Sequence, residues 1–429
     1  LGFMAVAWWR LEWAMACTLF TVPFYLFPKT LYLQDLGLAQ LLGRSDPISF
    51  SLVEFGTLAC FAAWAGRRYL YPRHRGTETA FKMPLAYLGP PAALFAASLL
   101  SLLFSEHLRF SLREFRVVIF EPLIFYLMVV DTARSPGRAS LLLNTFVALG
   151  LVVSVAALTH DLFTGAAETT GGVQRTLAIY NSPNALALFL GRVIPVAAAL
   201  ALWEMKRAGF RYRSPYLWVG GIMAVVLFFT YSRGAWLAVL TSLFFIAAIS
   251  SRKWVIAGAA VLLVAFSVAV ASPERALALS PVAQRLYIWQ AALEMLREHP
   301  ITGVGLDNFL YHYPSYMLPQ AWREPQVSHP HNILLDFWLR LGILGVVAMT
   351  WAQVSFWRGA VRIYRRAKGW DRAVALALMA SMVDFLVHGL VDNSFFLVDM
   401  AYIFWLSFGI TAALDTQTAS QRVEPIQDI

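Results

Sequence analysis

Long apolar segments follow one another along almost the whole chain, and they constrain the fold more than any other feature. Each is close to the roughly 20 residues that an α-helix needs to cross the hydrocarbon core of a bilayer. Twelve such segments are predicted, near residues 11–28, 47–65, 83–104, 114–131, 139–160, 183–203, 215–231, 234–250, 253–271, 332–356, 371–392 and 395–415. The segment from Leu11 onward has no small-residue cleavage site after it, so we expect it to be the first span and not a signal peptide. The sequence therefore predicts an all-α fold, a polytopic transmembrane helical bundle of about 12 TM helices.

The composition agrees with a membrane protein. The chain is 59% hydrophobic and only 14% charged, whereas soluble domains are about 45–50% apolar and about 25% charged. The formal net charge of +9 lies mostly in short loops between the apolar segments, where it sets orientation, so we expect no nucleic-acid partner. The two cysteines, Cys17 and Cys60, both lie in apolar segments and are too few for a disulfide framework or a cysteine metal site.

Basic residues gather after the even-numbered spans. They are Arg67, Arg68, Arg73, Arg75, Lys206, Arg207, Arg211, Arg213, Arg252, Lys253, Arg358, Arg362, Arg365, Arg366, Lys368 and Arg372. Because cytoplasmic loops carry the excess of Lys and Arg, both termini are predicted to face the cytoplasm. Four parts follow: nine spans in residues 1–271, an outer loop in 272–331, three spans in 332–415, and a short disordered cytoplasmic tail in 416–429.

The outer loop is the only long stretch too polar to lie in hydrocarbon. It contains an amphipathic helix, Pro281 to Glu298, on which Arg285 and Trp289 share the largely apolar face with Ala292 and Leu296. Such a helix lies in the membrane interface, where it can hold a cation over whatever enters from the lipid. The Gly303-Val304-Gly305 stretch has no preceding strand, which favours a turn over a nucleotide loop. We expect the active site in this loop.

Several predicted spans place arginines at the outer level. They are Arg109, Arg113, Arg116, Arg175, Arg233 and Arg285. Any one of them could simply extend to lipid headgroups. Together they favour a pyrophosphate ligand, because guanidinium groups bind phosphate oxygens in pairs and stay charged. No acidic cluster on this side is typical of a magnesium site, so we expect no metal.

Further charges lie inside the predicted spans. Arg192 and Glu121 are predicted at similar depth, and a structural ion pair between them is favoured over a catalytic Arg192. Asp336 and Arg340 are predicted to form an ion pair one helical turn apart, with no role in chemistry.

Histidines are concentrated in the outer loop. His331 precedes the tenth span, which would hold its imidazole rigidly as a general base, and Asp392 could orient it. His299 and His312 are expected to be solvated loop residues. Asp384, His388 and Asp392 form an i, i+4, i+8 stripe, which is equally compatible with a proton relay in a transporter.

Ordered short motifs carry a family resemblance. They are Thr230-Tyr231-Ser232-Arg233-Gly234-Ala235-Trp236, Arg285 through Trp289, His299-Pro300-Ile301-Thr302-Gly303-Val304-Gly305-Leu306-Asp307-Asn308, His331-Asn332 and Leu341-Gly342-Ile343-Leu344-Gly345, with Ser182-Pro183-Asn184 upstream. Over roughly residues 225–350 the chain resembles the O-antigen ligase/polymerase family of polytopic membrane glycosyltransferases.

The resemblance implies an enzyme of the bacterial inner membrane whose site faces the periplasm. It implies an undecaprenyl-pyrophosphate glycan donor, a lipid A–core acceptor for a ligase, surrounding membrane lipids, and no cofactor. Polymerases and protein O-oligosaccharyltransferases of the same family remain alternatives, and the single dominant outer loop ending in His-Asn favours a ligase. A flippase or transporter is the alternative from another class, although we find no inverted repeats.

Residue roles are carried over as expectations. Arg233 and Arg285 would hold the pyrophosphate and His331 would take the acceptor proton in a single inverting displacement. Further substrate-binding residues would be Arg175, Arg192, Arg116, Arg113, Trp289, Asn332, His329 and Asp392.

Overall fold

The structure is a computed structural model that describes residues 2–31, 48–70, 83–164, 168–170, 173–208, 214–250, 280–321 and 326–420. Its longer helices are α2 (Leu11–Phe20), α4 (Leu52–Ala65), α5 (Leu85–Leu103), α7 (Glu121–Thr132), α8 (Pro136–Thr164), α9 (Pro183–Ala208), α10 (Pro215–Phe229), α11 (Arg233–Ser250), α14 (Ser280–Glu298), α16 (Ile333–Arg366), α17 (Gly369–Gly389) and α18 (Val398–Ser420). Shorter helices are α1 (Gly2–Trp9), α6 (Leu108–Glu114), α15 (Phe309–Tyr316), two 3₁₀ turns (Val22–Leu26 and Pro319–Ala321) and two π-helical turns (Gly66–Leu70 and Phe115–Phe120).

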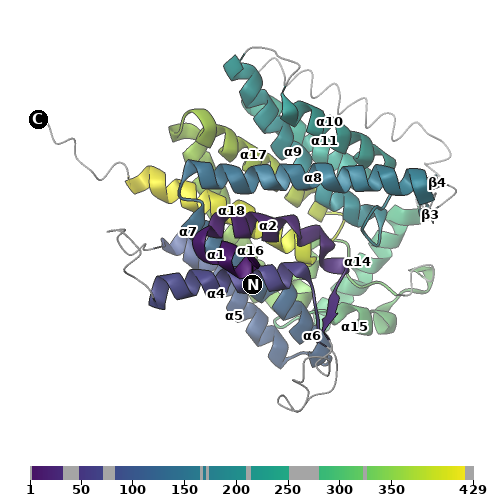
Figure 1. Cartoon of the computed structure of the whole chain (residues 1–429). Helices are drawn as coiled ribbons and strands as arrows, with labels where there is room; N and C mark the ends of the chain where they lie inside the picture. The colour runs from purple at the N-terminus through teal and green to yellow at the C-terminus, as the bar shows by residue number, and fades with distance from the viewer. Residues whose placement is uncertain are drawn as a thin grey trace, which may run out of the picture.

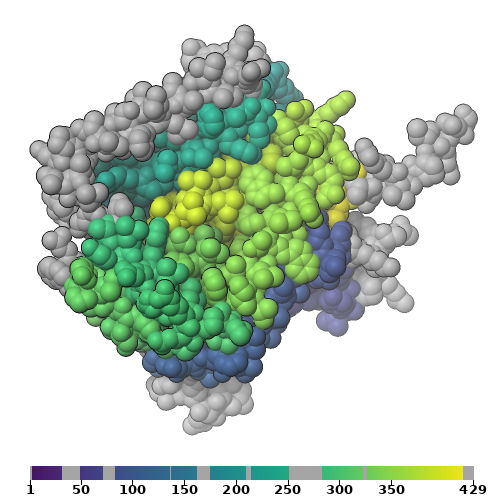
Figure 2. Space-filling model, turned by 180° about the vertical axis from the view of Figure 1, so that it is seen from behind, coloured from purple at the N-terminus to yellow at the C-terminus, as the bar shows by residue number. Residues whose placement is uncertain are grey.

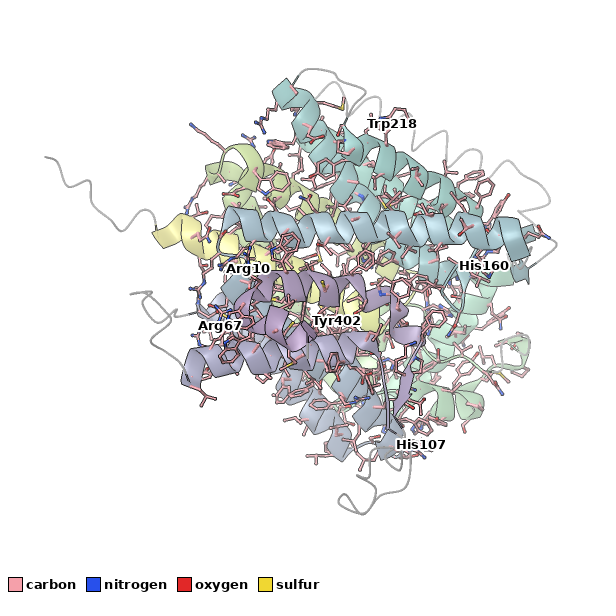
Figure 3. The ribbon with its side chains drawn as sticks, viewed as in Figure 1. Arg10, Arg67, His107, His160, Trp218 and Tyr402 are labelled. Carbon is pink, nitrogen blue, oxygen red and sulfur yellow. The ribbon has the colours of Figure 1, made fainter. Side chains whose placement is uncertain are left out.

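The strands of the described residues form two short antiparallel sheets of two strands each. One pairs β1 (Lys29–Leu31) with β2 (Ile48–Phe50), and the other pairs β3 (Glu168–Thr170) with β4 (Val173–Arg175). Figure 1 shows β3 and β4 on the side of the bundle where α8 ends, with α14 and α15 towards the same side. Figure 3 places His107 and His160 towards this end, and Arg10 and Arg67 towards the opposite end.

The predicted all-α membrane fold is confirmed. Seven described helices are long and apolar enough to cross a bilayer, namely α5, α8, α9, α11, α16, α17 and α18. Eleven of the twelve predicted spans coincide with helical segments, and the span near 253–271 lies outside the described residues. The chain is a multi-pass membrane protein, while the count of twelve crossings stays a prediction.

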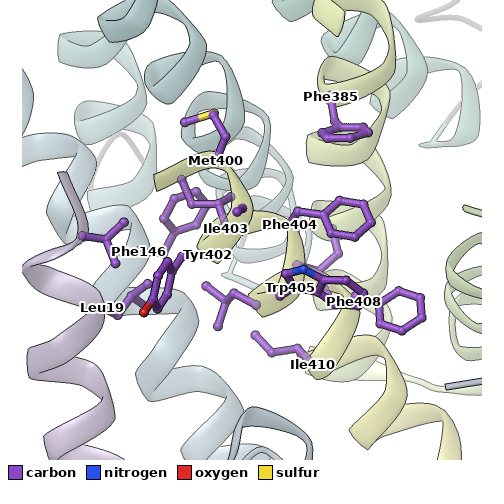
Figure 4. Packing of buried hydrophobic residues seen from close by; sticks show 14 of the residues in the cluster. Leu19, Phe146, Phe385, Met400, Tyr402, Ile403, Phe404, Trp405, Phe408 and Ile410 are labelled. Carbon is purple, nitrogen blue, oxygen red and sulfur yellow. The ribbon is translucent and has the colours of Figure 1, made fainter. Parts of the chain in front are cut away.

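Helix α18 forms the centre of the bundle, since its most apolar stretch is completely buried within the protein. Tyr402, Phe404, Trp405 and Phe408 pack against one another and against neighbouring helices there (Figure 4). The Tyr402 hydroxyl lies 2.8 Å from Thr57 Oγ1 on α4, which satisfies a polar group that would otherwise be buried unpaired. Because α18 continues to Ser420, the prediction of a disordered tail from residue 416 is wrong for its first five residues, and residues 421–429 lie outside the described residues.

Helices α9 and α17 pack closely because Gly191 leaves space for a carboxylate. A Cβ atom at Gly191 would lie 2.8 Å from Asp384 Oδ1. In this space Arg192 forms a buried ion pair with Asp384, and Ser381 Oγ donates a hydrogen bond to the Arg192 carbonyl. The predicted Arg192–Glu121 pair is wrong, since depth along a span does not say which helix is the neighbour. Glu121 instead lies 3.6 Å from Arg116.

Helix α16 is kinked at Gly342, where φ is +65°. At the kink, backbone N–H and C=O groups of α16 are free to form hydrogen bonds with the turn around Gly303. Val304 N donates to the Leu339 carbonyl at 2.7 Å, and Ile343 N donates to the Ile301 carbonyl at 3.0 Å. A Cβ atom at Gly342 would overlap the Ile301 carbonyl oxygen. The Gly303 turn and α16 therefore interlock, which fixes the outer loop onto the first turns of α16.

The outer segment has a small core of its own. The predicted amphipathic helix is confirmed as α14, and Ile288 and Met295 on it pack with Phe309, Tyr313 and Leu339. Figure 2 shows α14, α15 and the start of α16 as one continuous surface region at one corner of the molecule. This packing gives α14 a rigid support, so residues on it can hold a fixed geometry.

Candidate functional site

Two histidines and an aspartate from distant parts of the chain meet at the outer end of α16 and α17. His331 Nδ1 lies 3.0 Å from Asp392 Oδ1, and His329 Nε2 lies 3.4 Å from the same oxygen. The two imidazoles are 3.1 Å apart between His329 Nε2 and His331 Nδ1. His331 therefore directs its Nδ1–H to the carboxylate, which leaves Nε2 to accept a proton.

Helix α17 ends at Gly389, so Asp392 lies beyond it in a turn. The predicted i, i+4, i+8 stripe is therefore wrong for its last member: Asp384 and His388 stay on the helix, and Asp392 turns towards the histidines. Asp384 is occupied by Arg192. This arrangement separates a structural pair deep in the bundle from a carboxylate at the outer site.

The charge state of the site follows from burial and hydrogen bonds. Burial acts to raise the pKa of Asp392, but hydrogen bonds from His329 and His331 outweigh it and hold that pKa well below its ordinary value. Burial and the neighbouring His331 lower the pKa of His329, with Asp392 acting in the opposite direction. At neutral pH the site therefore combines an ionised carboxylate with a neutral His329.

The backbone around His331 is constrained on both sides. His331 has φ of +51°, a left-handed conformation that costs a non-glycine residue free energy. Asn332 caps α16, because its Oδ1 accepts from the Leu334 and Leu335 amides, and its Nδ2 donates to the Leu390 carbonyl at 3.2 Å. Asn332 thus ties the start of α16 to the turn that carries Asp392, and it sets the imidazole in place.

Arg285 reaches the same carboxylate from α14. Its NH2 atom lies 3.9 Å from Asp392 Oδ2, and its side chain is 27% exposed. Trp289 stands one turn further along α14 with a buried Nε1 that has no hydrogen-bond partner among the described residues. Helix α14 thus brings the Arg285 cation to the carboxylate that the two histidines share, and it carries a buried indole donor one turn further along.

Arg233 begins α11, and it is exposed. The next residue, Gly234, packs against the turn of Asp392, since a Cβ atom there would lie 2.9 Å from Val391 Cγ2. Tyr231, just before Arg233, has φ of +50°. A non-glycine residue in the left-handed region thus occurs beside Arg233, as it does at His331.

Arg340 was predicted to be a simple ion-pair partner of Asp336, and the pair is confirmed with Nε 2.6 Å from Oδ1. The structure adds partners that the sequence did not indicate. Arg340 also forms a buried ion pair with Glu114 of α6, and its NH2 atom donates to the Ser328 carbonyl at 3.2 Å. Because Ser328 directly precedes His329, Arg340 holds the histidine loop. The sequence feature that could have indicated these further partners is the position of Arg340 inside an apolar span, because a buried charge there needs partners.

Other predicted site residues lie with partners of their own. Arg175 donates to the Thr230 carbonyl and to Asn184 Oδ1, each at 2.8 Å, so it braces the turn before Arg233. Arg116 pairs with Glu54 of α4 and with Glu121, the first residue of α7. Arg113 is exposed and lowers the pKa of nearby Asp307, although burial raises that pKa more.

The remaining outer histidines differ from the prediction. His312 is only 15% exposed and lies 3.7 Å from Glu106, and the ring of His299 is 6.3 Å from that of His312. Because both are partly buried, the prediction of solvated loop residues is wrong for them.

His329, His331 and Asp392 are the described residues whose arrangement could hold a metal ion, since their ligand atoms lie within 4.8 Å of one another. Two of the donors already point their N–H groups at Asp392 Oδ1, and the Asn393 amide donates to it at 2.9 Å. These hydrogen bonds satisfy the carboxylate without an ion, and they fit a carboxylate–histidine pair for proton transfer.

Comparison with known proteins identifies a similarity over the middle of the chain. The O-Antigen ligase family model matches residues 218–350, which contain Arg233, Arg285 and His331. An O-antigen ligase of Salmonella typhimurium (strain LT2) is 29% identical over 202 residues, which cover 42% of this chain and 49% of that protein. The chain thus spans about half the length of the curated relative it matches. Over this region the chain is thus similar to the O-antigen ligase family, and the rest of the chain lies outside the matched family model.

Proposed function

We propose that this protein is an O-antigen ligase, which transfers O-antigen polysaccharide from undecaprenyl pyrophosphate to lipid A–core oligosaccharide. The observation that carries the proposal is the His331–Asp392 contact at 3.0 Å with Arg285 beside it. It supplies a base whose free nitrogen can face an acceptor hydroxyl, and a cation next to that base for a leaving group that gains negative charge.

The reaction is one displacement at the anomeric carbon. The acceptor oxygen forms a bond to that carbon while the bond to the pyrophosphate oxygen breaks, and the acceptor proton passes to His331 Nε2. The products are the glycosylated acceptor and undecaprenyl pyrophosphate, with inversion at the anomeric carbon. Arg233 and Arg285 would neutralise the pyrophosphate, and ionised Asp392 would stabilise the imidazolium that forms.

The other predicted residues support this centre. Trp289 Nε1 is a buried donor beside Arg285, and His329 shares Asp392 with His331. Asn332 and Arg175 would act by holding the backbone at His331 and Arg233. Arg192 and Arg116 would act through the structure, because each is paired with a carboxylate, and the exposed Arg113 would contribute positive potential.

The protein would lie in the inner membrane of a bacterium. Its site would face the periplasm, and both termini would lie in the cytoplasm. The distribution of basic loops supports this orientation. Single cysteines at Ser328 and Arg366, introduced into a chain without Cys17 and Cys60, would test it. We expect a membrane-impermeant maleimide to label Ser328→Cys in intact spheroplasts and to leave Arg366→Cys unlabelled until lysis.

A reconstitution tests the function itself. Purified protein is mixed with polyprenyl-pyrophosphate glycan and lipid A–core, without ATP and with EDTA, and the products are separated by size and lipid content. Glycan attached to lipid A–core supports a ligase. Longer glycan on the polyprenyl carrier, formed from donor alone, would instead identify a polymerase, and no transfer to either acceptor would contradict a glycosyltransferase.

A further inference from the structure

A cavity of about 850 Å³ opens at the end of the bundle opposite the His331 site. Helix α9 starts beside Arg175 and ends at this cavity, while α17 starts at the cavity and ends beside Asp392. The cavity is lined by the last turns of α9 and α11, the end of α16 and the first turns of α17. It therefore does not belong to the site described above.

Three cations line this cavity, namely Lys206, Arg207 and Arg372. None of them has a carboxylate partner among the described residues, whereas Arg362 nearby on α16 is paired with Asp415 at 2.8 Å. Within the described part of the chain, no carboxylate lines the cavity. The positive charge here is thus available to a ligand.

Two of the residues that line the cavity each carry a buried hydrogen-bonding atom without a partner among the described residues. These atoms are Ser250 Oγ at the end of α11 and Trp370 Nε1 at the start of α17. Buried donors are nearly always satisfied, by protein, water or a ligand. The first turn of α17 lines the same cavity, and its N-cap residue, Lys368, makes no side-chain capping bond, so its free amides add positive potential.

Aromatic rings hold the cations and the indole in place. The Arg207 guanidinium carbon lies 5.5 Å from the Trp203 ring centre, and that of Arg372 lies 4.5 Å from the Tyr364 ring centre. Trp203 and Trp370 meet edge to face with centres 5.1 Å apart. These contacts reduce the side-chain freedom that a ligand would otherwise have to restrict.

The deeper wall of the cavity is apolar. Leu202 and Leu376 lie about one helical turn inward from Lys206 and Arg372, and Ile249 lies beside Ser250 at the end of α11. A volume of this size suits a ligand of many atoms and is larger than a phosphate ion requires. A charged group at the mouth and an apolar part behind it is the arrangement of a membrane lipid, and basic pockets between membrane helices bind anionic headgroups.

We propose that this cavity binds one anionic phospholipid, with its headgroup phosphate held by Lys206, Arg207 and Arg372. Trp370 Nε1 and Ser250 Oγ donate hydrogen bonds to the headgroup, and the first acyl carbons lie against Leu202, Ile249 and Leu376. The site goes beyond the proposed transferase activity and does not depend on it. The shared chemistry is a phosphate monoanion, which a free phosphate also carries, so the test separates the two.

The test is lipid binding by native mass spectrometry and by thermal shift, using the full chain purified in an uncharged detergent. Three probes are compared: phosphatidylglycerol, phosphatidylcholine with the same acyl chains, and inorganic phosphate. We expect one phosphatidylglycerol to bind saturably, and phosphatidylcholine and inorganic phosphate to bind at least about tenfold more weakly. Phosphatidylcholine carries no net charge, and inorganic phosphate makes no apolar contact.

Matched variants distinguish a site from general surface charge. Lys206→Gln/Arg372→Gln removes two lining charges, and we expect it to weaken phosphatidylglycerol binding about tenfold or more. Arg365→Gln/Arg366→Gln removes two exposed charges of the same end that do not line the cavity, and we expect less than a twofold change. Trp370→Phe keeps the ring and removes the donor, and it should weaken binding severalfold. Each variant is first checked for helical content and monodispersity.

Equal weakening by the two double variants would overturn the proposal, because it would show a diffuse charge effect. Equal binding of phosphatidylcholine would show an apolar groove without headgroup recognition. Inorganic phosphate binding as tightly as phosphatidylglycerol would replace the lipid by a free anion and would also overturn it. Loss of transferase activity plays no part in these readouts, so failure here leaves the proposed function untouched.

Discussion

Asp392→Asn removes the charge on which the proposed base depends while keeping the shape of the side chain. The carboxylate contacts His331 Nδ1 at 3.0 Å and would face an imidazolium once the acceptor proton has been taken. Opposite unit charges at that distance, with an effective dielectric constant of about 20, attract by about 5.5 kcal/mol, which sets an upper limit of about 10⁴-fold on the loss of kcat. Replacing a charge-assisted hydrogen bond by a neutral one costs about 1.5 kcal/mol, which sets a lower limit of about tenfold.

We therefore expect kcat of Asp392→Asn to fall by a factor between these limits, near a few hundredfold. The KM for the donor should change little, because Arg285 keeps its charge and loses a competing carboxylate. The assay is initial-rate glycan transfer with purified protein and both substrates. Glu106→Gln is the matched control, since Glu106 lies on the same outer end, is 69% exposed and contacts His312 instead of His331. A kcat within threefold of wild type for Asp392→Asn would refute the reasoning.

Three further predictions concern the supports of the site. Arg340→Met leaves Glu114 and Asp336 buried and uncompensated, so we expect about 3–5 kcal/mol of lost stability and a partial rescue by Arg340→Lys, measured by denaturant unfolding in detergent. Gly342→Ala places a Cβ atom on the Ile301 carbonyl oxygen at positive φ, so the free energy of unfolding should fall by at least about 2 kcal/mol. Gly221→Ala is the control: a Cβ atom there meets nothing within 4 Å, so stability should stay the same or rise slightly. Equal effects of the two substitutions would contradict the interlocked kink. Because the folded-state pKa of His329 lies below its unfolded value, its contribution to stability is present above about pH 6.5 and is lost as pH falls towards the folded-state pKa. The melting temperature of His329→Gln should therefore fall less than that of wild type between pH 7 and 5, and parallel curves would contradict this assignment.

Hydrophobicity was enough to predict most of the helical segments. Apolar length identifies spans because the bilayer sets a fixed requirement, and the amphipathic pattern from Pro281 to Glu298 identified α14 to within one residue. The link between His331 and Asp392 was also predicted, because both lie at the outer ends of spans. The histidine and the aspartate are 61 residues apart along the chain, and only their common level in the membrane brings them together.

The partners of buried charges could not be predicted in the same way. Arg192 pairs with Asp384 and not with Glu121, because the choice depends on which helix faces α9 and on the missing side chain at Gly191. The hydrogen bond from Arg340 to Ser328 depends on how the histidine loop folds back onto α16, and the kink at Gly342 is a further feature that a regular helical pattern does not reveal. The depth of a residue in the membrane follows from its position along one helix. The helix that its side chain faces is decided by how all the helices pack together.

The most direct measurement is single-turnover transfer by His331→Ala, with donor binding determined on the same sample. General acid–base catalysis contributes about 10²–10⁴-fold, so the transfer rate should fall at least 100-fold while the donor Kd stays within about threefold, because the arginines that hold the pyrophosphate are unchanged. A His331→Ala protein that transfers glycan at the wild-type rate would contradict the account.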